Sequence, residues 1–154
     1  APLSASPSPT EKTSREGKDS LIRVLLAEDN PADVNLVQMA FDDHALNAEF
    51  TVQSDGHEML QYIERIDALE VARPDIVLLD LNLPKVKGHA ILIRLRESPV
   101  CTEVPVVIVS SSNDPKDREN AARSGATRYF CKPNDYDQFM QLGDVVRSVI
   151  SRRS

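Results

Sequence analysis

The sequence predicts an α/β fold: an open parallel sheet of five strands in the order 2-1-3-4-5, with helices on both faces. Apolar, strand-like runs alternate five times with amphipathic, helix-like segments, and no internal repeat is visible. Residues 76–79, Ile-Val-Leu-Leu, lack polar alternation, which is typical of a central strand covered on both faces. Five parallel strands leave the sheet open. In this order the topological switch point, where the strand order reverses and ligands bind, lies beside strands one and three.

The first two βα units carry clear start and turn signals. Strand one covers residues 22–27, and Asn30-Pro31 is a typical start for a helix that runs to about residue 44. A short second strand at 49–53 ends in the turn Asp55-Gly56, and the next helix starts near residue 57. The charged stretch 64–74 is longer than a connection requires, so we interpret it as the end of that helix and a returning loop.

The remaining units follow the same pattern. Pro84 and Gly88 break the chain after strand three, Ser98-Pro99 stops the helix that follows, and Gly125 ends the next one. We predict strands at 76–79, 104–109 and 127–131, and helices at 88–97, from Asp114-Pro115 to Gly125, and at 134–151.

Composition indicates a soluble protein with one folded domain. Residues 1–20, rich in Ser and Pro, are predicted to form a disordered tail ahead of a domain at 21–154. The net charge of −6 and the absence of tryptophan argue against a nucleic-acid surface. No apolar run approaches the ~20 residues of a membrane span, and Cys101 and Cys131 lack disulfide or metal-ligand spacing. We expect a cytoplasmic protein that binds neither nucleic acid nor membrane.

Acidic residues follow two of the predicted central strands. Glu28-Asp29 comes directly after strand one, and Asp80 directly after strand three. In open α/β sheets the carboxyl ends of the strands meet at one rim, where ligands bind. Carboxylates a few Å apart repel by about 4 kcal/mol per pair at an effective dielectric of about 20, so such a cluster requires a cation. Mg²⁺ suits this rim better than Ca²⁺, because few protein ligands are offered. Taken alone, Asp80 could equally cap a turn.

A hydroxyl and an ammonium complete the predicted rim. Ser110 follows strand four, and Lys132 follows strand five. An ammonium that faces a metal-bound carboxylate suggests an anion between them, and phosphoryl is the commonest anion handled by Mg²⁺, Lys and a hydroxyl together. Asp80 would then be the nucleophile that carries the phosphoryl group. The alternative for Lys132 is an ordinary solvated lysine.

The ordered set of strand-end residues resembles the receiver domain of two-component response regulators, which has a flavodoxin-like fold. The resemblance covers residues 21–151, and the separation of 30 residues between Asp80 and Ser110 agrees with the family. Lys87 departs from the pattern, because many receivers have an acidic or amide residue there. The residues that carry the resemblance are Glu28-Asp29, Asp80, Asn82, Pro84, Gly88, Ser110, Tyr129 and Lys132-Pro133.

The resemblance implies a phosphoacceptor and its metal ligands. Asp80 would accept a phosphoryl group from the phosphohistidine of a histidine kinase. Asp29 would bind Mg²⁺ directly, and Glu28 through a water molecule. The backbone carbonyl of Asn82 would be a further ligand.

The resemblance also implies a switch. Ser110 would swing toward the phosphoryl group, and Lys132 would pair with that group. Tyr129 would turn inward after the swing. The Lys132-Pro133 bond would be cis, as it is in the family, because proline makes that isomer inexpensive.

Three loops, at residues 28–33, 81–85 and 132–135, are similar to those of stand-alone receivers that serve bacterial phytochrome kinases. This implies a red-light-sensing histidine kinase as partner and a homodimer through the fourth helix, fifth strand and fifth helix. We expect output by protein contact, with Tyr129, Tyr136 and Met140 as candidate contact residues. The protein would be a phosphorylation switch that loses its own phosphate, not an enzyme that releases a product.

Two other functions use similar residues. Phosphatases of the haloacid-dehalogenase type also have an aspartyl nucleophile, a Lys and an acidic pair. In those enzymes the acidic pair comes near the end of the chain, whereas Glu28-Asp29 comes first here. They also have a second Asp two residues after the nucleophile, where this chain has Asn82. A flavodoxin-like cofactor site is disfavoured, because the acidic loop after strand one repels a phosphate. A receiver that has lost phosphorylation would lack Asp80, Lys132 or the acidic pair.

Overall fold

The sheet has the predicted topology. The structure, a computed structural model, describes residues 21–151, so the predicted tail at 1–20 lies outside the described residues. Five strands, all parallel, form one sheet in the order β2-β1-β3-β4-β5, which confirms the predicted fold class. The strands are β1 (Ile22–Ala27), β2 (Ala48–Gln53), β3 (Ile76–Leu79), β4 (Val106–Ser110) and β5 (Arg128–Cys131).

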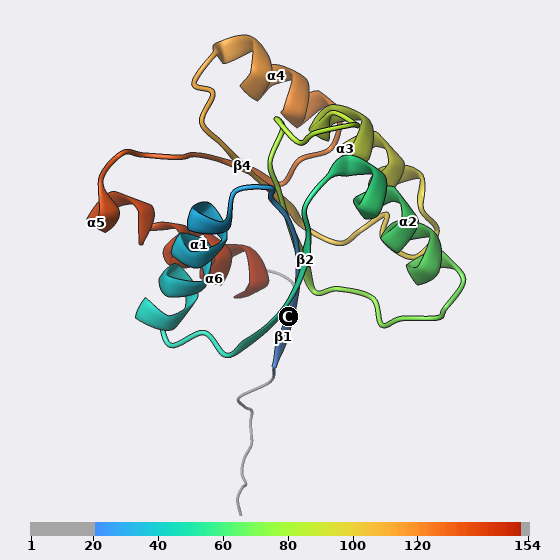
Figure 1. Ribbon diagram of the computed structural model, residues 1–154, viewed down its shortest axis with the longest axis horizontal. Coiled ribbons are helices and arrows are strands. Elements are labelled where there is room, and N and C mark those ends of the chain that lie inside the picture. Colours follow the sequence, from blue (N-terminus) through green and yellow to red (C-terminus); the bar gives the residue numbers. More distant parts are fainter. Residues whose placement is uncertain (1–20, 152–154) are drawn as a thin grey trace, which may run out of the picture.

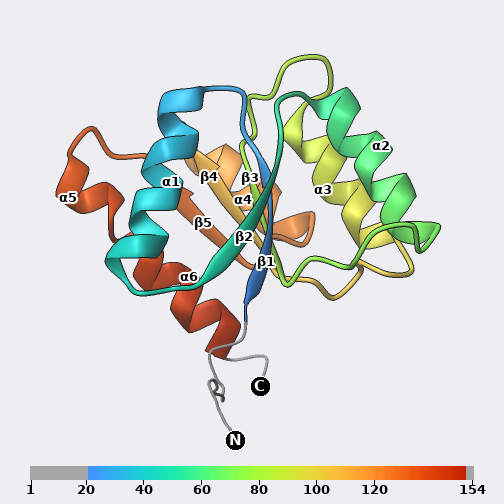
Figure 2. The same ribbon diagram turned by 60° about the horizontal axis from the view of Figure 1, so that its bottom comes forward.

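Helices cover both faces of the sheet. α1, α5 and α6 lie on one side, and α2, α3 and α4 on the other (Figures 1 and 2). The helices are α1 (Pro31–Asp43), α2 (Gly56–Asp67), α3 (Gly88–Glu97), α4 (Pro115–Arg123), α5 (Tyr136–Phe139) and α6 (Leu142–Ser151). The predicted helix starts at Asn30 and Asp114 are correct, and α2 starts at Gly56, next to the predicted position 57. The side chains of Asn30, Asp55 and Asp114 each accept a hydrogen bond from a backbone N–H of the helix that follows.

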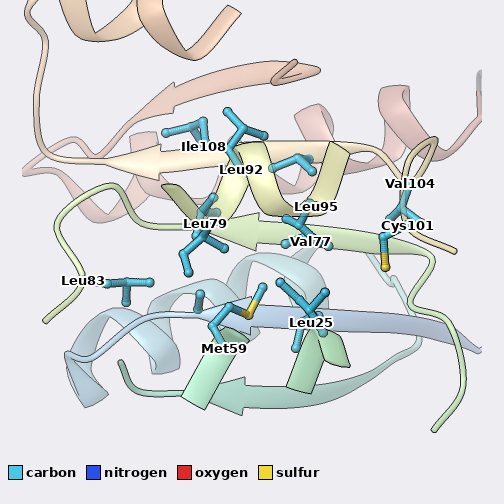
Figure 3. Packing of buried hydrophobic residues seen from close by; sticks show 14 of the residues in the cluster. Leu25, Met59, Val77, Leu79, Leu83, Leu92, Leu95, Cys101, Val104 and Ile108 are labelled. Carbon is cyan, nitrogen blue, oxygen red and sulfur yellow. The ribbon is translucent and has the colours of Figure 1, made fainter. Parts of the chain in front are cut away.

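Two hydrophobic clusters hold the layers together. On the face of α2 and α3, Leu25, Leu79 and Ile108 of neighbouring strands pack against Met59 and the α3 side chains (Figure 3). On the other face, Phe41 and Phe139 pack against alternate residues of the same strands. Because β1, β3 and β4 are covered on both sides, their carboxyl ends are held at fixed positions along one rim.

The end of the chain differs from the sequence-based prediction. One helix was expected at 134–151, but α5 ends at Phe139 and α6 starts at Leu142. Gly143 and Asp144 make hydrogen bonds to carbonyls three residues earlier, and Gly143 lies so close to the His44 ring that a Cβ would overlap it. Glycine also favours a helix less than other residues do. Met140, expected at the surface, is only 5% exposed and packs in the core.

Two glycines bring the loop after β3 close to its neighbours. A Cβ at Gly88 would lie 2.5 Å from the Cα of Leu81, and a Cβ at Gly56 would lie 2.4 Å from the carbonyl oxygen of Val86. The Gly56 amide donates to the carbonyl of Pro84 at 2.9 Å. The loop that follows Asp80 is thus fastened to the start of both α2 and α3.

Arg96 ties α3 to two loops at the opposite end of the sheet. Its guanidinium donates to the carbonyls of Thr102, Val104 and Gly125 at 2.7–3.0 Å. Arg96→Ala would leave these carbonyls without that partner, so we expect the free energy of unfolding in urea to fall by about 2–4 kcal/mol. Arg123→Ala, which removes only an exposed pair with Glu119, should cost less than about 0.5 kcal/mol. Equal losses for the two variants would contradict a structural role for Arg96.

None of the helices within residues 21–151 combines the length and the apolar character that crossing a membrane requires. The two cysteines are free thiols, Cys101 buried and Cys131 half-buried.

Candidate functional site

The acidic residues predicted at the rim lie together. Carboxylate oxygens of Glu28, Asp29 and Asp80 all fall within 4.8 Å of one another. Glu28 and Asp80 are buried, at 2% and 5% exposure, whereas Asp29 faces solvent. Pairing of β1 with β3 explains the cluster, because Ala27 and Leu79 are partners in the sheet and each strand ends at that point.

Lys132 supplies the positive charge. Its ammonium donates to Glu28 at 2.8 Å, to Asp33 at 2.8 Å and to Asp80 at 3.1 Å. The lysine side chain is only 12% exposed, so it is not the solvated surface lysine considered as the alternative. Its backbone amide donates to the carbonyl of Ser110 at 2.7 Å, which holds the ends of β4 and β5 side by side.

Asp33 is a site residue that the sequence interpretation missed. The helical pattern of α1 indicated that Asp33 points away from the apolar face, and it does, but the direction it takes is toward Lys132. Its position in the first turn of a helix that starts at the rim was the available signal. A first-turn side chain there lies above the strand ends, and a carboxylate is also favourable at a helix N-terminus.

Burial and neighbouring charged groups shift the pKa values of two residues, Glu28 and Lys132. Burial, together with the nearby Asp80 carboxylate, raises the pKa of Glu28 to about 7, although Lys132 acts in the opposite direction. Hydrogen bonds to Asp33 and Glu28 raise the pKa of Lys132 despite its burial, so it stays protonated. The rim therefore holds a permanent cation beside a carboxyl group that titrates near neutrality.

The raised pKa of Glu28 predicts a pH dependence of stability. The stability contributed by Glu28 is fully present below its unfolded pKa of 4.5 and is lost as the pH rises to about 7. In EDTA, the free energy of unfolding of Glu28→Gln should therefore fall less over this range than that of the parent, by on the order of 3 kcal/mol. Urea titrations at several pH values measure the difference. Glu97→Gln, on the exposed side of α3, is the control, and parallel curves for parent and Glu28→Gln would contradict the prediction.

Asp80 is held at both carboxylate oxygens. One oxygen accepts from the backbone amide of Asn82 at 2.9 Å, and the other from Lys132. Asn82 thus contacts Asp80 through its backbone N–H. A carboxylate fixed in this way, beside an ammonium and two further acids, can present an oxygen to an electrophile while a cation balances the charge.

Ser110 and Tyr129 belong to one hydrogen-bonded loop. The hydroxyl of Ser110, which is fully buried, accepts from the backbone amide of Ser112 at 3.1 Å. The Tyr129 hydroxyl donates to the carbonyl of the same Ser112 at 2.8 Å, and its ring is half-buried against the α3 and α4 face. The expected cis bond at Lys132-Pro133 was wrong: no cis peptide bond occurs in residues 21–151. Proline reduces the free-energy preference for the trans peptide bond to about 0.5–1 kcal/mol, so a proline does not by itself select the cis isomer.

Residues 24–143 match the family model of the response regulator receiver domain. The chain belongs to the response regulator receiver family. Its phosphoacceptor role in two-component signalling follows from that membership, and receiver domains are phosphorylated by histidine kinases. The phosphatase alternative finds no support in the comparisons.

Two sequence relatives indicate the breadth of the family. The chain is 30% identical over 132 residues to the probable methanogenesis regulatory protein FilR2 of Methanothrix harundinacea, which covers 86% of the chain and 84% of FilR2. It is 33% identical over 95 residues to the response regulator Rcp1 of Synechocystis, which covers 61% of the chain and 65% of Rcp1. The segment aligned in sequence therefore spans just under two thirds of Rcp1.

Two solved structures share the fold closely. The phosphorylated cyanobacterial phytochrome response regulator RcpA superposes with a TM-score of 0.77 at 28% identity, covering 88% of this chain and 97% of RcpA. The Mn²⁺-bound form of Rcp1 superposes with a TM-score of 0.73 at 26% identity, covering 82% and 92%. Receiver domains related to this chain thus include one solved with a phosphoryl group and one with a divalent metal.

Proposed function

We propose that Asp80 is the phosphoacceptor of this receiver domain, with Lys132 and Ser110 as its catalytic partners. The observation that carries the proposal is the Lys132 ammonium, which lies 3.1 Å from Asp80 in a cluster of acidic side chains, two of which, Glu28 and Asp80, are buried. A structural salt bridge needs one carboxylate for one ammonium. Here one ammonium meets three carboxylates, and the excess negative charge requires a further cation.

We propose that this cation is Mg²⁺, held by Asp29, Asp80 and the backbone carbonyl of Asn82, with Glu28 acting through water. The donor set supports this choice, because hard oxygen ligands on a partly open rim suit a small divalent ion that retains water. When bound, the ion would neutralise the oxygens of the incoming phosphoryl group.

The reaction is a transfer of the phosphoryl group between two protein side chains. The phosphorus–nitrogen bond of a phosphohistidine breaks, its electron pair stays on the imidazole, and an oxygen of Asp80 bonds to phosphorus. Lys132 then pairs with a phosphoryl oxygen, and the Ser110 hydroxyl donates to another. Hydrolysis by water later releases inorganic phosphate and restores the carboxylate, so the protein is a timed switch that removes its own phosphoryl group.

The partner we propose is a sensor histidine kinase of the phytochrome type, and the output is contact between proteins. The likeness to RcpA and Rcp1 supports the kinase class. We propose a homodimer through α4, β5 and the α5–α6 segment, because β5 is an edge strand and both neighbouring helices face solvent. Tyr136, 50% exposed on α5, is an available contact residue.

Labelling by acetyl phosphate tests the proposed function directly. The chain should acquire one acid-labile phosphoryl group in the presence of Mg²⁺ and none in EDTA. Mass spectrometry of the intact chain counts the groups. Labelling that is independent of metal would contradict the proposed role of the acidic cluster.

A further inference from the structure

Helix α4 has little apolar attachment to the rest of the domain. Its sequence, Pro-Lys-Asp-Arg-Glu-Asn-Ala-Ala-Arg, buries a single residue, Ala121. Burial of an apolar face is what normally fixes a helix in place. The position of α4 therefore depends on a few specific contacts made by its polar side chains.

The contacts at the start of α4 converge on Tyr129. The guanidinium carbon of Arg118 lies 4.7 Å from the centroid of the Tyr129 ring, within the range of a cation–π contact. Arg118 also donates to the side chain of Asn113 at 3.4 Å, and Ser112 donates through its hydroxyl to Asp117 at 2.5 Å. Tyr129 is thus held at its hydroxyl by the β4–α4 loop and over its ring by α4.

These contacts form a continuous path from the rim to the surface. The Ser110 hydroxyl accepts from the Ser112 amide, the Ser112 carbonyl accepts from Tyr129, and the Tyr129 ring lies against Arg118, which is exposed. A Ser110 hydroxyl that turns to a phosphoryl group releases the Ser112 amide. Since Ser112 also carries the acceptor of Tyr129, a shift of this residue moves the ring on which Arg118 rests.

We propose that Arg118 is a positioning residue of the switch, which holds Tyr129 against the β4–α4 loop and passes a change at Ser110 to the exposed face of α4. The inference rests on the proposed phosphoacceptor function. A guanidinium suits this role better than an ammonium, because its plane stacks on a ring while its N–H groups reach the loop. Loss of an exposed cation–π contact changes an equilibrium about two- to fivefold, so Arg118 biases the switch without locking it.

The experiment follows the side-chain Nε–H signal of Arg118 by ¹⁵N NMR in the full chain. Stacking over a ring shifts this proton upfield, so the shift should be present in the parent and absent in Tyr129→Leu. Mg²⁺ with beryllium fluoride, a phosphoryl analogue, should move the signal in the parent. In Ser110→Ala the analogue should still perturb the Leu81 amide, next to Asp80, but leave Arg118 in place. Arg123, on the same helix and paired with Glu119, is the matched control and should not respond.

Each result decides a separate part of the proposal. An Arg118 signal identical in the parent and Tyr129→Leu would overturn the stacking. A signal that moves equally in Ser110→Ala would overturn the path through Ser110. If the analogue does not shift the Leu81 amide signal in any variant, the proposed phosphoacceptor function is wrong. The comparison of the parent with Tyr129→Leu still decides whether Arg118 positions the ring. As a second measurement, Arg118→Gln should reduce the analogue-induced shift of the Tyr129 ring protons about two- to fivefold.

Discussion

Asp80→Asn should abolish Mg²⁺-dependent, acid-labile labelling of the chain by acetyl phosphate. The amide has the shape of the carboxylate but lacks the charged oxygen that attacks phosphorus. Its carbonyl oxygen can still accept from the Asn82 amide, so the loop after β3 should keep its conformation. Labelling by mass spectrometry should fall to background, while the unfolding midpoint shows that the variant is folded.

Two variants make the result specific to Asp80. Asp29→Asn removes an exposed acid of the same cluster and should weaken Mg²⁺ binding without removing the acceptor, so labelling persists but needs higher Mg²⁺ concentrations. Asp137→Asn, exposed in the first turn of α5, should label like the parent. Unchanged labelling of Asp80→Asn would show that another residue is the acceptor.

Lys132→Ala should lower the stability of the domain and also disrupt signalling. Removing the ammonium leaves Glu28, Asp33 and Asp80 close together without their shared partner, and loss of one member of a buried ion pair costs about 3–5 kcal/mol. In EDTA, the free energy of unfolding should fall by about that amount. Mg²⁺ should restore more stability to this variant than to the parent, because the ion becomes the remaining balancing charge.

The same variant should separate labelling from its consequence. Some phosphoryl transfer to Asp80 should remain, but any change in self-association on labelling, measured by sedimentation, should be lost because no ammonium pairs with the phosphoryl group. Lys87→Ala, an exposed lysine in the loop after β3, is the control for stability. If labelling still changed the self-association of Lys132→Ala, Lys132 would have no role in the switch.

Most of the fold and the core of the site could be predicted from the sequence because both depend on short-range patterns. Apolar runs set the strands, and parallel strands place the residues that follow them on one rim, so Glu28, Asp29, Asp80 and Lys132 could be brought together without coordinates. The strand order followed from the βα alternation and the resemblance together.

The sequence-based predictions failed at positions where contacts between distant residues determine the structure. The role of Asp33 could not be predicted, because helical periodicity indicates which side of a helix is apolar but not what lies opposite its polar side. The break between α5 and α6 depends on the close approach of Gly143 to His44, a residue about one hundred positions earlier. The contact of Arg118 with Tyr129 joins a helix to the next strand by side-chain direction alone, which no spacing rule predicts.

The partners of Lys132 have a consequence for synthesis of the protein in the cell. Glu28, Asp33 and Asp80 precede it by 104, 99 and 52 residues, so the ammonium meets its carboxylates only after nearly the whole domain has been made. While β5 is still inside the ribosome, the emerging chain has its acidic residues but not the charge that draws them together. The acidic cluster of a nascent chain therefore lacks its shared ammonium until β5 has left the ribosome, so the site is completed late in synthesis.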